Sequence, residues 1–84
     1  MMASTHVGSG SLLLYLDNQV IMQNTESVIV ELEENRDYII HWFVQGAAGT
    51  QYSVTISSPK EAQFQLTKML QDSGKDLGSL RFGV

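Results

Sequence analysis

The sequence contains no cysteine, so no disulfide framework can hold this 84-residue chain together. Its two histidines alone cannot close a structural zinc site. A chain of this length forms one domain, which buries only about 60% of the surface that its unfolded form exposes. We therefore expect the fold to depend on side-chain packing or on a partner, because the usual covalent and metal supports of small domains are missing.

Basic residues are scarce: five lysines and arginines stand against nine acidic residues, which gives a net charge of −4. They form no basic patch, which argues against nucleic acid or an anionic membrane surface as a partner. The longest apolar run, residues 12–16, is too short to span a bilayer or to form the core of a signal peptide. We expect a soluble protein with no membrane insertion and no cofactor. An extracellular or periplasmic location would require that a signal had been removed.

The first ten residues are rich in serine, glycine and threonine. This composition is typical of flexible chain ends and of vector remnants. We predict a flexible leader over residues 1–10, followed by a single domain over residues 11–84.

Alternation of apolar and polar side chains is the main structural signal in that domain. Residues 12–16 and 19–23 alternate on either side of Asp17-Asn18, two residues that tolerate a positive φ, and this predicts a hairpin. Residues 27–33 alternate as a half-buried strand and residues 80–84 as a terminal strand, whereas residues 38–45 are apolar on both faces. This spacing predicts an all-β fold, an antiparallel β-sandwich of six or seven short strands.

The apolar strand over residues 38–45 is followed by a Gly-Ala-Ala-Gly turn and a second alternating segment, residues 51–57. We predict a hairpin with an odd loop over residues 46–50, because that register gathers the large side chains on one face. Burying that set is worth roughly 1.5–3 kcal/mol per large side chain. The predicted pairs are Val44 with Tyr52, Trp42 with Val54, and Ile40 with Ile56.

The segment over residues 59–72 fits two structures. Ser58, Pro59, Glu61 and Gly74 form a helix-boundary pattern, which gives an α+β alternative with one helix at 59–72. Against this, alternation from residue 62 to residue 67 leaves Phe64 off the apolar stripe of such a helix. We favour a strand.

The second apolar face of residues 38–45 is the main candidate for a functional surface. In the predicted register it lies beside polar residues of the following strand, which makes it suitable for an apolar or sugar-like ligand or a second subunit. A simpler arrangement has the C-terminal segment covering it through Phe64 or Leu66. The candidate binding residues are Ile39, His41, Phe43, Gln51, Ser53 and Thr55.

Other residues offer little chemistry. His41 falls beside Thr55 in the predicted register, but no carboxylate is placed to complete a catalytic triad. Residues 72–76 are rich in oxygen ligands but lack the spacing of an EF-hand loop. Trp42 lies in an alternating apolar face and is expected in the core. We expect neither an enzyme nor a metal site.

Three segments, VELEENRDYII at 30–40, GTQYSVTI at 49–56 and GKDLG at 74–78, together resemble a known class of module. The pattern looks like the accessory β-sandwich modules of secreted bacterial proteins, the jelly-roll or immunoglobulin-like units that include pre-peptidase C-terminal domains. It covers residues 26–84 and implies a sandwich with an accessory role. Asn35-Arg36 stands where that family usually has glycine, and its acidic metal ligands are not found here, so no functional residue is transferred.

The sequence thus favours a non-catalytic β-sandwich binding module that contacts a protein or glycan partner through a sheet face or edge. The alternative is a structural or oligomerisation subunit, which would bury the second apolar face against a copy of itself as a homo-oligomer.

Overall fold

The computed structural model describes residues 1–84 and is an all-β sandwich. It contains no α-helix, and its one helical element is a short 3-10 turn, Lys60–Ala62. The structure has eight strands, one more than the six or seven that the sequence predicted. The strands are β1 (Met2–Val7), β2 (Ser11–Leu16), β3 (Gln19–Gln23), β4 (Glu26–Ile29), β5 (Asp37–Gln45), β6 (Gln51–Ser58), β7 (Phe64–Met69) and β8 (Lys75–Gly83).

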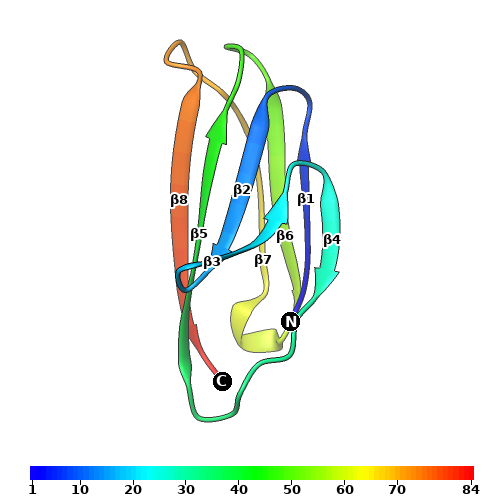
Figure 1. The fold of residues 1–84 in the computed structure, drawn as a ribbon, viewed down its shortest axis with the longest axis vertical. Helices are drawn as coiled ribbons and strands as arrows, with labels where there is room; N and C mark the ends of the chain where they lie inside the picture. Colours follow the sequence, from blue (N-terminus) through cyan, green and yellow to red (C-terminus); the bar gives the residue numbers. More distant parts are fainter.

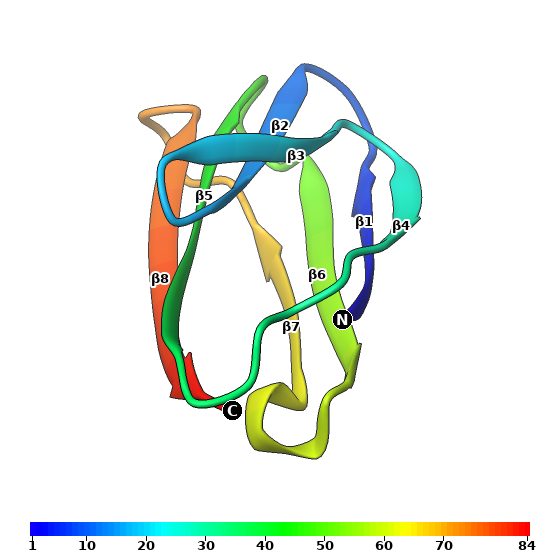
Figure 2. The same cartoon turned by 60° about the horizontal axis from the view of Figure 1, so that its bottom comes forward.

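The strands form two four-stranded antiparallel sheets that pack face to face. One, here called the β5 sheet, has the order β3-β2-β5-β8, and the other, the β6 sheet, has the order β4-β1-β6-β7. Figures 1 and 2 show β8, β5 and β2 on one side of the molecule and β6, β1 and β4 on the other. The expected antiparallel sandwich is confirmed.

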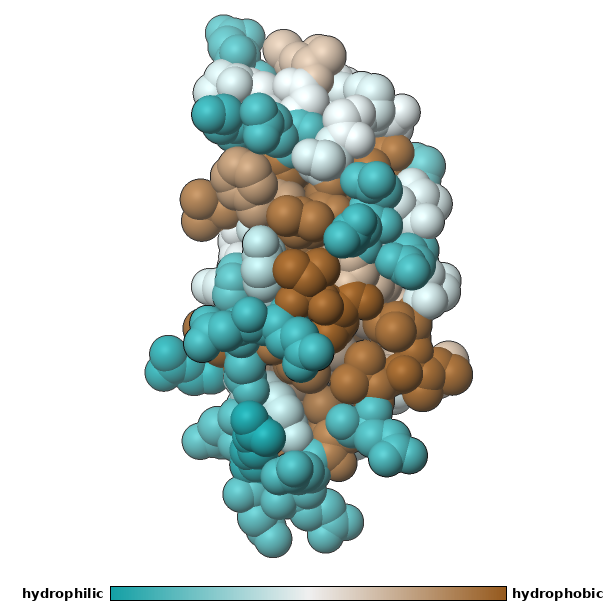
Figure 3. Space-filling view, in the orientation of Figure 1, coloured by the Kyte–Doolittle hydropathy of each residue, from teal (hydrophilic) through white to brown (hydrophobic).

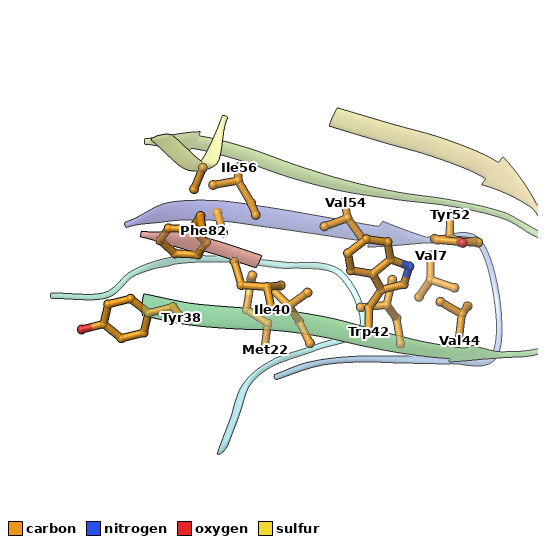
Figure 4. Close-up of a cluster of buried hydrophobic side chains, with 14 of the residues drawn as sticks. Val7, Met22, Tyr38, Ile40, Trp42, Val44, Tyr52, Val54, Ile56 and Phe82 are labelled. Atoms are coloured by element: carbon orange, nitrogen blue, oxygen red, sulfur yellow. The ribbon is translucent and has the colours of Figure 1, made fainter. Parts of the chain in front are cut away.

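The core lies between the two sheets and is built from alternate residues of the central strands. Ile40, Trp42 and Val44 on β5 are buried, and they face Val54 and Ile56 from β6 (Figure 4). Each large apolar side chain that is removed from water contributes roughly 1.5–3 kcal/mol, so this layer supplies most of the stability. Trp42 is a core residue, as its alternating pattern predicted.

The predicted hairpin between residues 38–45 and 51–57 is wrong. β5 pairs with β2 and β8, whereas β6 pairs with β1 and β7, so residues 46–50 cross from one sheet to the other. The inward faces of both strands were nevertheless assigned correctly, because alternation fixes which side chains are buried. It does not fix which strand supplies the hydrogen bonds.

The predicted flexible leader is also wrong, because Met2–Val7 forms β1 in the middle of the β6 sheet. Ala3, Thr5 and Val7 point inward and are buried. The Thr5 hydroxyl donates a hydrogen bond to the carbonyl oxygen of Asn24 over 2.5 Å, which satisfies the buried polar group. The inward side chains are small, and this is why the strand looked like a linker.

The strand interpretation of the ambiguous segment is confirmed over Phe64–Met69, and the alternative with a helix at 59–72 is wrong. Only the single turn Lys60–Ala62 follows Pro59. β7 is an edge strand that directs Phe64 inward, where its ring centroid lies 5.5 Å from that of Trp42. Burial of Phe64 against the core therefore outweighs the helix-capping pattern.

Candidate binding surface

The predicted binding residues do not form one surface. Because β5 and β6 belong to different sheets, the residues of each strand that alternate with its core positions point away from the core in opposite directions. The first group, on the outer face of the β5 sheet, is Ile39, His41 and Phe43. The second group, on the outer face of the β6 sheet, is Gln51, Ser53 and Thr55.

The same separation removes the only catalytic pair that the sequence suggested. His41 and Thr55 were expected side by side, but they lie on opposite outer faces of the sandwich. His41 instead stacks on Tyr15 of β2, with ring centroids 4.6 Å apart and planes 7° from parallel. On its other side His41 is paired with Ser79 of β8. His41 is thus part of an aromatic pair, and it is not placed to act as a base toward the Thr55 hydroxyl.

Apolar side chains surround that aromatic pair on the outer face of the β5 sheet. The strand registers place Leu13, Phe43 and Leu77 in one row across β2, β5 and β8. Val20 of the edge strand β3 lies opposite Tyr15 of β2 and extends the apolar surface to that edge of the sheet. We call Leu13, Val20, Phe43 and Leu77 the apolar band.

The apolar band is exposed at its two ends, and Leu13 and Phe43 between them are half-buried. Leu77 is 73% exposed and Val20 is 39% exposed. Phe64 and Leu66, the residues expected to cover this face, instead pack against the core on the inner side of the β6 sheet. Figure 3 shows hydrophobic side chains running as a continuous band over β8, β5, β2 and β3 toward β4. Phe64 and Leu66 therefore do not form the expected lid, and Ile39, His41 and Phe43 on the second face of β5 are half-buried.

A polar cluster that the sequence did not suggest lies at the end of the core next to the connection over residues 46–50. The Tyr52 hydroxyl donates a hydrogen bond of 2.5 Å to Asp76 Oδ2, and Lys68 Nζ lies 3.8 Å from the same oxygen. Burial, followed by the bond to Asp76, raises the pKa of Tyr52 to about 12. The phenol is thus neutral at physiological pH and joins β6 to β8. Tyr52 and Asp76 are too far apart in sequence for any motif to connect them.

Trp42 lies beside this cluster, where its indole acts against burial and Asp76 by lowering the pKa of Tyr52. Its Nε1 atom is buried with no hydrogen-bond partner, and Figure 4 shows the ring lying across the core between β5 and β6. The indole therefore fills the core mainly as apolar volume, because its Nε1–H makes no hydrogen bond of normal geometry.

The outer face of the β6 sheet carries a different kind of surface. A depression of about 590 Å³ lies over β1 and β4, and its lining contains no titratable side chain. The lining residues are Met2, Ala3, Ser4, Ser27, Val28, Ile29 and Ser57. No acid or base is available there for proton transfer.

Nowhere do three or more histidine, aspartate or glutamate side chains converge as metal ligands. The structure has no helix with the length and apolar character needed to cross a membrane. Comparison with known protein families, curated proteins and solved structures gives no match for this chain.

Proposed function

We propose that this protein is a non-catalytic binding module whose contact surface is the outer face of the β5 sheet. The observation that supports this proposal is the apolar band, which crosses the sheet and is exposed at both ends. Contiguous apolar surface of this kind is uncommon on monomers and marks contact sites when it occurs. Covering it gains about 25 cal/mol for each Å² of apolar area removed from water.

A protein surface is the partner that the band fits best. Its exposed members Val20 and Leu77 are aliphatic, and aliphatic side chains pack against other apolar side chains. Sugar-binding faces instead use open aromatic rings. One face of the Tyr15 ring is already occupied by His41, which leaves less aromatic surface for a sugar. The rim holds Asp37 and Arg81, charged residues of both signs, as the rim of a protein interface does.

The test compares immobilised wild type with Val20→Glu and Leu77→Glu, two exposed positions in the band. Thr67→Glu, on the exposed outer face of the β6 sheet, is the matched control. Extract from the source cells is passed over each protein, and the retained proteins are quantified by mass spectrometry. We expect at least one protein to be retained by wild type and the control and lost from both band variants, because a charge in an apolar contact is costly to bury.

The same retained set on all four proteins would refute the proposed surface. A glycan array with these variants tests the other class of ligand. Binding of a sugar that is lost with Val20→Glu and Leu77→Glu would keep the surface but replace the protein partner by a glycan.

A further inference from the structure

β8 is an exposed sheet edge with unusual length and regularity. Its nine residues pair with β5 on one side only, and that register runs from Lys75 to Gly83 without interruption. The other three edge strands are shorter: β3 has five residues and a register shift beside it, β4 has four and β7 has six. Long regular edges are ready to accept another strand, and natural proteins usually shorten or distort them.

The hydrogen bonds to β5 show which backbone groups of β8 are free. The Val84 N–H donates to the Arg36 carbonyl over 3.1 Å, and the Gly74 carbonyl accepts from the Gly46 N–H over 2.8 Å. Backbone groups alternate in direction along a strand, so even-numbered residues of β8 face β5 and odd-numbered ones face the open edge. The odd-numbered residues are Lys75, Leu77, Ser79, Arg81 and Gly83.

We infer that this edge pairs with β8 of a second copy of the chain, antiparallel and centred on Ser79, to form one continuous eight-stranded sheet. In this register Ser79 lies opposite its own copy and Leu77 lies opposite Arg81 of the other chain. All paired residues are odd-numbered, so their N–H and C=O groups face each other as an antiparallel ladder requires. The full length of β8 is used.

Charge selects the partner and the register. Lys75 of one chain falls opposite Gly83 of the other, and the carboxylate of Asp37 lies over Gly83: a β-carbon built there would be 2.6 Å from Asp37 Oδ1. Neither Lys75 nor Asp37 has an ion pair within its own chain, so two Lys75–Asp37 pairs form across the two-fold axis. Centring the ladder on Gly78 would instead place Lys75 opposite Arg81, where like charges repel.

At Lys75 and Leu77 the edge would have to give up local hydrogen bonds before it could form hydrogen bonds with a second chain. The Lys75 N–H is bonded to the Ser73 hydroxyl over 3.3 Å, and the Leu77 N–H to Asp76 Oδ1 over 2.9 Å. These side chains keep the donors satisfied in the single chain. The edge-facing backbone groups of Ser79, Arg81 and Gly83 have no such partner. Ser79 lies opposite its own copy, whereas Arg81 and Gly83 lie opposite Leu77 and Lys75 of the other chain, so pairing begins at Ser79.

The test measures the mass of the purified chain by sedimentation equilibrium, from about 10 µM to about 1 mM, a range that reports weak and moderate association. We expect wild type to form a dimer that weakens with added salt. Ser79→Pro removes an edge-facing donor and should abolish the dimer, while an edge strand tolerates proline where its N–H faces solvent. Thermal unfolding confirms that the single chain still folds.

A charge exchange tests the register. Lys75→Asp and Asp37→Lys should each weaken the dimer by about tenfold or more, and the double variant should restore it, because the pair is rebuilt in reverse. Val20→Glu leaves β8 unchanged and should leave the dimer intact, which separates edge pairing from contact through the apolar band. A wild type that stays monomeric at the highest concentration, or a dimer that survives Ser79→Pro, would overturn the inference.

Discussion

Replacing Gly78 by alanine tests how closely the Trp42 indole packs over β8, the neighbouring strand of its own sheet. Gly78 lies on β8 directly opposite Trp42 on β5, and both point toward the interior. A β-carbon built on Gly78 would lie 2.6 Å from Trp42 Cε2 and 2.9 Å from Nε1, and closer still to Cζ2. Real β-carbons do not approach other atoms this closely, so the indole or β8 must move.

The cost follows from what surrounds the indole. Phe64 lies 5.5 Å away on the opposite sheet, so the ring cannot tilt without disturbing a second aromatic side chain. Overpacking of this kind costs about 1–3 kcal/mol. Replacing glycine within a strand recovers roughly 0.5–1 kcal/mol of backbone entropy, which offsets only part of it. We expect Gly78→Ala to lose about 1–2 kcal/mol, or roughly 4–16 °C in Tm for a domain of this size.

The measurement is thermal and urea unfolding followed by circular dichroism and tryptophan fluorescence. Gly8→Ala is the matched control, because a β-carbon there would make only ordinary contacts, the nearest at 3.5 Å from the Gln51 carbonyl oxygen. In a Trp42→Phe background the penalty for Gly78→Ala should shrink, since phenylalanine lacks the atoms that collide. Equal stability of Gly78→Ala and Gly8→Ala would refute the close approach of Trp42 to β8.

Two further predictions concern side-chain hydrogen bonds. Tyr52→Phe should lose about 1–2 kcal/mol at neutral pH, because it removes the hydroxyl that donates to Asp76. The pKa of Tyr52 is raised from 10.0 to about 12, so the folded state holds the phenol proton more tightly than the unfolded state. The stability that Tyr52 contributes is therefore complete below pH 10 and is lost as the pH rises toward 12. Urea midpoints across this range should fall more steeply for wild type than for Tyr52→Phe, and parallel curves would contradict the assignment. Asn24 has a φ of 59°, and its Oδ1 accepts the Leu12 N–H over 3.1 Å. Asn24→Ala should therefore lose about 1–2 kcal/mol in urea unfolding and Asn24→Gly clearly less, because glycine keeps the backbone conformation and loses only the hydrogen bond; equal losses would show that the conformation contributes little.

Local signals in the sequence predicted local structure well. Asp17, with a φ of 55°, makes the turn expected between β2 and β3, and its carboxylate also accepts the Ile39 N–H over 3.1 Å. Alternation likewise identified the buried faces of β5 and β6. These features depend on neighbours in sequence or on a period of two along one strand, and both are visible in the chain itself.

Non-local pairing was not predicted. The glycines and alanines at 46–49 suit a tight hairpin and a crossover between sheets equally well, so the sequence did not show that β5 and β6 part. That one difference decided the candidate site, because it placed Ile39 and Thr55 on opposite faces of the molecule. The inward positions of β1, Ala3 and Thr5, carry too little apolar surface to mark a strand, although they lie in the core.

The two proposed contacts meet at β8 and can still be separated. Leu77 ends the apolar band and also lies on the open edge, so Leu77→Glu perturbs both surfaces. Val20 lies on β3, at the far edge of the same sheet, and reports only on the band, whereas Lys75 lies outside the band and reports only on edge pairing. In the two-fold pair Leu77 would pack along the aliphatic part of the other chain's Arg81, which extends the band across both copies. A partner held by the band should therefore bind the dimer more tightly than a monomeric Ser79→Pro variant, because the dimer offers it a longer apolar surface.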